Sequence, residues 1–117
     1  MNTFKERLRR YGDACREVSL LAGHLRYLKE GEDASGTRIR KIHTRLKLAR
    51  AARRAAKIHA EEIISRVPEK LNMREIMRMR YIDLMRWKDI SECLDLEQRW
   101  VLRLHKRALD SLTGDAQ

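Results

Sequence analysis

The sequence predicts an all-α protein, in which a long antiparallel helical hairpin (residues 1–67) is followed by a three-helix head (residues 68–117). Apolar residues recur in steps of three and four along most of the chain, which is the period of one helix face. A polar segment with two glycines interrupts this pattern once, and the single proline, Pro68, interrupts it again. No stretch has the alternation of a half-buried strand, so we expect five helices and no strand.

The first predicted helix covers residues 3–30. Its apolar stripe consists of Phe4, Leu8, Tyr11, Cys15, Val18, Ala22 and Leu25. The glycines and short polar side chains between Gly31 and Thr37 favour a turn and a new helix start, so they end this helix.

A second helix is expected to begin near Arg38, with an inward stripe that a charged residue, Arg53, interrupts. The stripe consists of Ile39, Ile42, Leu46, Ala49, Arg53, Ala56, Ala60, Ile63 and Val67. Two such stripes joined by a short turn should pack antiparallel. Because the seam from Ala49 to Ala60 is mostly small, it buries little area, and a homodimer through this arm is one way to complete it. A single chain can also satisfy both stripes, so the oligomeric state stays open.

Pro68 disfavours helix at the preceding residue and marks the start of the head. Three helices are expected after it, at about 70–83, 87–94 and 97–112. The apolar surface of the first of them is expected to come from Leu71, Ile76, Met77, Met79, Tyr81 and Ile82. The methionines around it, from Met73 to Met85, are expected to fill an irregular helical core.

Residues 87–104 have the spacing of a helix-turn-helix motif, whose second helix enters a DNA groove. Counted from Trp87, apolar or small residues occupy the positions that two steeply crossing helices turn inward. They are Ile90, Ser91, Leu94, Leu96, Val101 and Leu104. Trp87 and Trp100 lie beside these positions, so we expect both in the partial core, with an anchor for RNA polymerase or another subunit as the alternative for Trp100.

The stretch IMRMRYIDLMRWKDISECLDLEQRWVLRLHKRALDSL resembles the fourth region of bacterial sigma factors and the heads of small phage transcription regulators. The shared pattern is RYI, a tryptophan, Ile-Ser with a leucine three residues beyond, a valine and the closing RLHKRAL run at residues 103–109. The resemblance covers about residues 68–112 and implies a promoter-type DNA-binding head. The basic helical arm in front of it is similar to phage and prophage regulators of the ArpU and RinA groups.

Three positions depart from the family pattern, and one of them is Leu102, which replaces a polar residue often found there. Asp95 stands in the turn where glycine is common, but aspartate adopts the left-handed conformation more easily than most residues. Leu84 replaces a small residue, so either it packs against the arm or the loop before Trp87 differs from that of the family.

The resemblance implies site residues on the last helix. It places Gln98, Arg99, Leu102 and Arg103 against base edges, and Lys106 and Arg107 toward the DNA backbone. Glutamine suits adenine and arginine suits guanine, while Leu102 suits a thymine methyl group. Lys88 completes the basic patch of the head.

The formal net charge of +10 favours a polyanionic partner, of which double-stranded DNA is the first candidate. The strongest local bias lies between Arg38 and Lys57, where nine cations occur with no acidic residue. Arg40, Arg45, Arg50 and Arg54 in this stretch are candidate contacts to the DNA backbone. An acidic protein partner and a merely solvated surface are the alternatives.

Other classes of function find little support. There is no apolar run of membrane-spanning length and no secretory signal, so we expect a protein of the bacterial cytoplasm, associated with the nucleoid and not with a membrane. Cys15 and Cys93 are expected to be buried free thiols. The four histidines, which lack metal-site spacing, are expected to line the hairpin or bind backbone. No catalytic motif occurs, and we expect no cofactor, no metal and no enzymatic activity.

Three hypotheses follow. The first is a sequence-specific, sigma-like transcriptional regulator of a phage or prophage, which acts by binding DNA without catalysis. The second is an interaction protein that mimics a sigma region and binds RNA polymerase or another host protein. The third is a component of a DNA-packaging or other nucleoprotein assembly.

Overall fold

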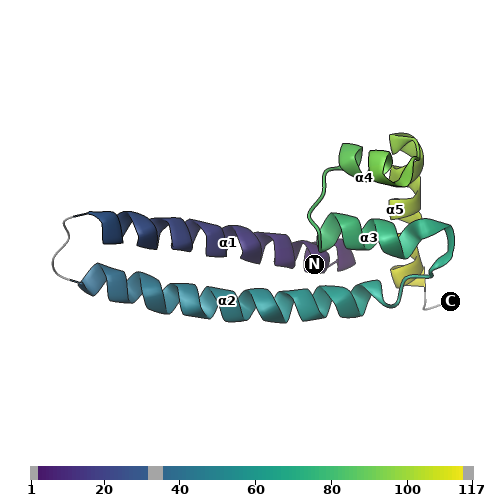
Figure 1. Cartoon of the computed structure of the whole chain (residues 1–117). Helices are drawn as coiled ribbons and strands as arrows, with labels where there is room; N and C mark the ends of the chain where they lie inside the picture. The colour runs from purple at the N-terminus through teal and green to yellow at the C-terminus, as the bar shows by residue number, and fades with distance from the viewer. Residues whose placement is uncertain (1–2, 32–35, 115–117) are drawn as a thin grey trace.

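The computed structural model describes residues 3–31 and 36–114, and within these ranges it is all-helical without strands, as expected. The elements are α1 (Phe4–Glu30), α2 (Thr37–Ile64), a short 3-10 helix η1 (Lys70–Asn72), α3 (Met73–Tyr81), α4 (Trp87–Leu94) and α5 (Gln98–Thr113). Helices α1 and α2 lie side by side and antiparallel as an arm, and α3, α4 and α5 form a head at the end where α1 begins and α2 ends (Figure 1). The molecule is elongated, with extents of 58 × 32 × 20 Å.

Helix α1 begins at a capping box. The backbone N–H of Glu6 donates to Oγ1 of Thr3 at 3.1 Å, and the backbone N–H of Thr3 donates to the Glu6 carboxylate at 3.3 Å, so two N–H groups that the helix leaves unpaired are satisfied. At the other end the N–H of Gly31 donates to the carbonyl of Tyr27. Helix α2 follows Gly36, which has a φ of +69° that glycine adopts without strain. Most of the predicted turn, residues 32–35, lies outside the described residues.

The two predicted stripes face each other within one chain. Toward the tip of the arm they form a buried cluster of Val18, Leu21, Leu25, Leu28, Ile42 and Leu46. Ala22, Ile39 and Ala49 pack against this cluster. Toward the tip of the arm the two stripes are therefore buried against each other within one protomer.

The charged residue in the seam, Arg53, lies half-buried in the middle of the arm, near Tyr11. The pKa of Tyr11 is raised by its interaction with the Cys15 thiol and by burial, and the guanidinium of Arg53 opposes this shift. A polar stretch therefore separates the apolar cluster at the tip from the core at the base of the arm.

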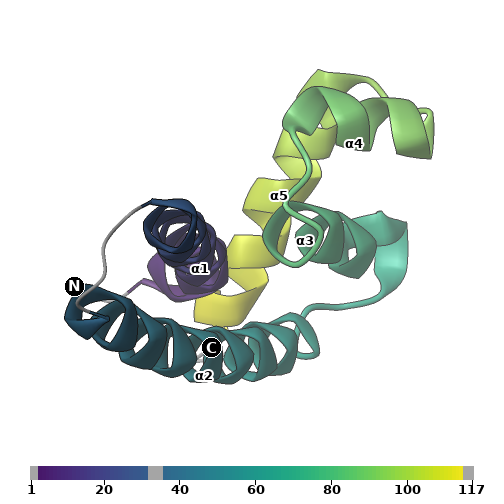
Figure 2. The same ribbon diagram turned by 60° about the vertical axis from the view of Figure 1, so that its left-hand side comes forward.

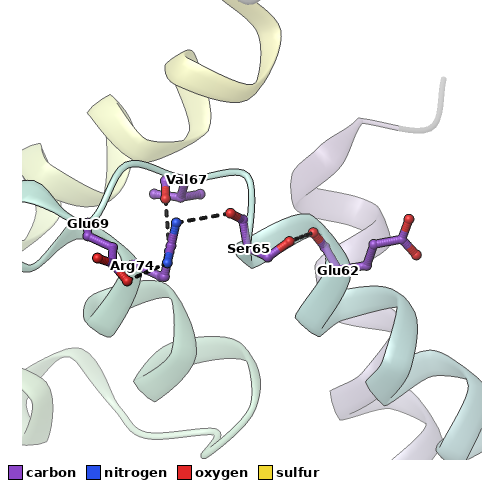
Figure 3. A network of polar contacts seen from close by, with 5 residues as sticks. All are labelled: Glu62, Ser65, Val67, Glu69 and Arg74. Atoms are coloured by element: carbon purple, nitrogen blue, oxygen red, sulfur yellow. Dashed lines mark hydrogen bonds and ion pairs between the residues drawn. The ribbon is translucent and has the colours of Figure 1, made fainter.

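The end of α2 is held by Arg74 of α3 (Figure 3). Its guanidinium donates to the carbonyls of Val67 at 2.9 Å and Ser65 at 3.0 Å and pairs with Glu69 at 2.6 Å. These carbonyls follow the last helical turn and would otherwise lack partners in the helix. Helix α2 ends at Ile64, three residues before the expected end of the stripe, because Pro68 disfavours helix at Val67. Val67 is nevertheless fully buried.

The first helix of the head begins later than the sequence indicates. We expected it at about residue 70, but Leu71 and Asn72 have φ values of +57° and +60°, so α3 begins only at Met73. Leu71 is 48% exposed, which corrects its assignment to the apolar face of this helix. The other predicted residues of that face are buried or half-buried, and Met73, Met77 and Met79 fill the core as expected.

One hydrophobic core joins the base of the arm to the head. It contains Leu8 of α1, the end of α2 and the inward faces of α3, α4 and α5. Helix α5 crosses the molecule, with its C-terminal end against the arm and its N-terminal end beside α4, away from the arm (Figure 2). The tertiary packing thus holds the N-terminal half of α5 at an outer edge.

Leu84 packs against the arm, which is the first of the two explanations for its departure from the family pattern. A Cβ placed on Gly12 of α1 would lie 3.3 Å from the Leu84 Cδ2 atom. Leu84 has a φ of +58°, a conformation that a small residue such as glycine adopts more readily. Contact with α1 offsets this strain and links the loop before Trp87 to the arm.

Candidate nucleic-acid interface

Helices α4 and α5 share the core that the spacing predicts. Ile90, Val101 and Leu104 are fully or almost fully buried, Ser91 is buried, and Leu94 and Leu96 are half-buried. The Ser91 hydroxyl donates to the carbonyl of Lys88 at 2.7 Å, so this small polar side chain is satisfied within its own helix. All six predicted inward positions are therefore buried or half-buried.

The turn between the two helices is made by Asp95, which adopts the left-handed conformation with φ 54° and ψ 46°. The backbone N–H of Leu96 donates to the carbonyl of Ser91 at 3.0 Å and closes the end of α4. The expectation that Asp95 adopts the left-handed conformation, as glycine would at this position, is confirmed. Helix α5 then begins at Gln98, one residue after the expected start, with Glu97 as its N-cap residue.

The predicted contact residues of α5 are exposed together. They are Gln98, Arg99, Leu102, Arg103, Lys106 and Arg107. Arg99, Arg103 and Lys106 are spaced by four and three residues, so they share the face opposite to the buried residues. The N-terminal half of α5, which includes Arg99 and Arg103, lies away from the arm (Figure 2). Lys88 is exposed in the first turn of α4.

A shallow concave surface at the start of α5 adds two carboxylates to this region. It is lined by Asp95, Leu96, Glu97, Arg99, Trp100 and Arg103. Trp100 is 37% exposed, so it is a surface residue and not the partial core residue that we expected. Asp95 and Glu97 make this corner less attractive to phosphate than the face of Arg103 and Lys106.

The cations of the arm lie apart from α5. Arg40, Arg45, Arg50 and Arg54 are all exposed on α2. Arg40 is close to the tip of the arm, which points away from the head (Figure 1). None of these four arginines forms an ion pair with another described residue. The fold therefore presents two separate cationic surfaces.

His105 is a buried core residue, which corrects the expectation that the histidines line the hairpin or bind backbone. Its side chain on α5 is 6% exposed and shares a hydrogen bond of 2.7 Å between Nε2 and the Tyr81 hydroxyl. Its ring also meets the edge of Trp87 at 4.7 Å between centroids, and Trp87 is half-buried as expected. The sequence signal was present, because residue 105 follows the inward Leu104 and lies three residues before Ala108.

The electrostatics around His105 are positive. Burial lowers the pKa of His105 to about 4, and Lys5, Arg80 and Arg9 lower it further. Burial also raises the pKa of its partner Tyr81, against the opposing effects of Arg9 and Arg80. Both side chains are therefore neutral at pH 7, beneath a group of cations from α1 and α3.

Neither a metal site nor a membrane-spanning helix is formed by the part of the chain that the structure describes. The described residues bring no three histidine, cysteine or carboxylate side chains together in a way that suits one metal ion. No helix in residues 3–31 or 36–114 combines the length and apolar character that a bilayer span requires. Cys15 and Cys93 are free thiols, but the expectation that both are buried is wrong, because Cys15 is half-buried and Cys93 is exposed between the inward positions Ser91 and Leu94 of α4.

No known family model, curated protein sequence or solved structure matches the chain. The resemblance to the fourth region of sigma factors therefore depends on the residues of the head alone.

Proposed function

We propose that this protein binds double-stranded DNA through α5 and regulates transcription in a phage or prophage, without catalysis. Within this proposal Arg99, Arg103 and Gln98 select the site, and Lys106, Arg107 and Lys88 bind the backbone. Arginine can pair bidentately with guanine and glutamine with adenine. The protein would act on the nucleoid in the bacterial cytoplasm.

The observation that carries this proposal is the division of α5 into two faces. Val101, Leu104 and Ala108 are buried against the rest of the head, and Arg99, Arg103 and Lys106 are exposed on the opposite face. A recognition helix needs such a division, because one face must hold its angle while the other reaches the base edges. The N-terminal half of α5 also lies away from the arm, beside α4 (Figure 2).

The test is discrimination between DNA sequences. A target would first be selected from a random DNA pool with the unaltered protein. We expect the double variant Arg99→Ala/Arg103→Ala to lower the ratio of affinities for target and scrambled duplex by about tenfold or more, since each bidentate pair discriminates by about 1–3 kcal/mol. Titrations of both duplexes at one fixed salt concentration measure this ratio.

The matched control is Arg45→Ala/Arg50→Ala, which removes the same charge from exposed positions of α2. It should weaken binding to both duplexes alike and leave their ratio unchanged, because backbone contacts carry no sequence information. An unaltered ratio in the α5 variant would remove Arg99 and Arg103 from sequence selection.

One observation favours a second candidate function. The exposed indole of Trp100 lies in a concavity with Asp95 and Glu97, whose carboxylates repel phosphate. Exposed tryptophans are frequent anchors of protein interfaces. The second candidate is therefore binding to RNA polymerase, or to another host protein, through the start of α5. A shift of a selected duplex only in the presence of polymerase would favour this function over independent DNA binding.

A further inference from the structure

A second concave site lies where the arm meets the head. This cleft has a volume of about 280 Å³ and is formed by the first turns of α1, the end of α3, the loop at Leu84 and the start of α4. Four cationic side chains line it, namely Lys5, Arg9, Arg16 and Arg80, together with one carboxylate, that of Asp13. None of these residues belongs to the surface of α5 proposed above.

The charges in the cleft are unbalanced. Asp13 forms an ion pair with Arg16, so its carboxylate is already engaged. The guanidinium of Arg80 is held over the Trp87 ring at 4.5 Å from the centroid, and its Nη1 atom donates to the carbonyl of Met85 at 3.0 Å. Lys5 and Arg9 form no ion pair or side-chain hydrogen bond with another described residue. Three cationic side chains therefore face the cleft without a carboxylate partner among the described residues.

The same three cations also act on a buried side chain of the head. His105 contacts Tyr81 and Trp87, which line the cleft, and its pKa is lowered to about 4 by burial first and then by Lys5, Arg80 and Arg9. No carboxylate offsets this effect. Arg80 is also fixed in position by Trp87 and by the Met85 carbonyl, so its remaining donors are preorganised. A fixed guanidinium with free donors is suited to a tetrahedral oxyanion.

We propose that the cleft between α1 and the head binds a phosphate group through Lys5, Arg9 and Arg80. Arginine supplies forked donors and lysine a compact charge, and together they match the oxygens of phosphate. The phosphate has two candidate sources with the same chemistry: a phosphodiester of nucleic acid that passes the junction, or a free phosphate ion. The first source rests on the proposed function, and the second does not.

The two tryptophans allow a direct measurement. Trp87 lines the cleft, and Trp100 lies at the separate concavity of α5. In a Trp100→Phe background the fluorescence of the full chain reports on the cleft alone. We expect sodium phosphate to change the emission of Trp87 saturably, at an ionic strength held constant with sodium chloride.

Matched variants of α1 identify the residues. Lys5→Gln/Arg9→Gln should weaken the phosphate response by about tenfold, as expected for the loss of two charge-assisted contacts in a partly exposed site. The control Arg26→Gln/Lys29→Gln removes two exposed charges from the far end of the same helix and should keep the response. Circular dichroism of each variant checks that the fold is retained.

A titration with duplex DNA distinguishes the two sources of phosphate, the nucleic-acid backbone and the free ion. If the phosphodiester backbone occupies the cleft, Lys5→Gln/Arg9→Gln also weakens duplex binding and free phosphate competes with the duplex. If the ligand is a free phosphate ion, duplex binding is unaltered while the Trp87 response is lost. The cleft proposal is overturned if Trp87 responds neither to phosphate nor to duplex DNA, or if both double variants respond equally. Duplex binding through α5 can persist when the cleft proposal is overturned. A failure of the cleft proposal is therefore distinct from a failure of the proposed function.

Discussion

At the scale of single residues, burial changes the chemistry of one side chain in the head. His105 shares a hydrogen bond with Tyr81, contacts Trp87 and lies below cations from α1 and α3. A protonated imidazole there would lose hydration and meet like charges. The folded protein therefore keeps His105 neutral at pH values where an exposed histidine already carries a proton.

The stability of the protein should consequently fall as the pH falls from about 6.5 to about 4. The pKa of His105 is lowered from 6.5 to about 4 in the folded state, so the unfolded chain takes up the proton first. The contribution is fully present above pH 6.5 and amounts to at most about 3 kcal/mol. Urea unfolding at a series of pH values measures it.

The control for this prediction is His105→Gln, which keeps a hydrogen-bonding amide near Tyr81 and cannot titrate in this range. Both proteins share every carboxylate, so the difference between their stability profiles isolates His105. Parallel profiles between about pH 7.5 and pH 4.5 would show that His105 does not couple folding to protonation.

At the scale of elements, α2 carries a charge pattern that its packing does not explain. Its inward stripe is satisfied by α1, yet its outer faces carry cations from Arg38 to Lys57 without an acidic residue between them. Unpaired like charges three or four residues apart destabilise a helix. Such a helix is stabilised by a polyanion that lies along it.

Neutralising four arginines of α2 should flatten the salt dependence of DNA binding. In the variant Arg40→Gln/Arg45→Gln/Arg50→Gln/Arg54→Gln, the slope of log K against log salt should become less steep by about 0.9 for each DNA phosphate that α2 ceases to neutralise. Titrations of one duplex at several salt concentrations give the slope.

A control of equal charge uses Arg10, Arg66, Lys70 and Arg86, which are exposed outside α2 and outside the concave surface that Arg50 lines. Replacing all four by glutamine lowers the net charge by the same amount, so only a contact along α2 would make the two slopes differ. Identical slopes would restrict the outer faces of α2 to protein contacts or to solvent.

At the scale of the whole molecule, the arm and the head are joined by one core. Leu8 of α1 is fully buried in the same cluster as Ile90 of α4 and Val101 of α5. The chain therefore changes direction at Pro68, but the same hydrophobic core contains residues from both sides of it. We expect the base of the arm and the head to unfold together.

Replacing Leu8 by alanine tests this coupling. The cavity should lower the free energy of unfolding by about 2–5 kcal/mol and lower the melting temperature of the head as well as of the arm. Near-ultraviolet circular dichroism reports on the head, because both tryptophans lie there, and far-ultraviolet circular dichroism reports mostly on the long helices.

The matched variant is Leu25→Ala, in the separate cluster toward the tip of the arm. It should shift the tryptophan signal less than Leu8→Ala does. If the tryptophan signal of Leu8→Ala melts as in the unaltered protein, the head folds independently of the arm.

Much of the fold and part of the candidate site could be predicted from the sequence. The helices of the hairpin, the inward positions of α4 and α5 and the turn at Asp95 follow from periodicity and from the conformational preferences of single residues. The late start of α3 was missed, because two residues that are not glycine adopt the left-handed conformation there. Local pattern alone does not reveal such a conformation, which the surrounding packing must hold in place.

The sequence by itself determined most of the helices and most of their inward positions, because both properties depend on neighbours within a few turns. Only the tertiary structure decided that Trp100 is exposed, that Leu84 lies against Gly12 and that Lys5, Arg9 and Arg80 line one cleft. These relations join residues that are far apart in the chain, and they depend on the angle at which α5 crosses the arm. That angle is set by how the whole core fills its space, which no single segment encodes.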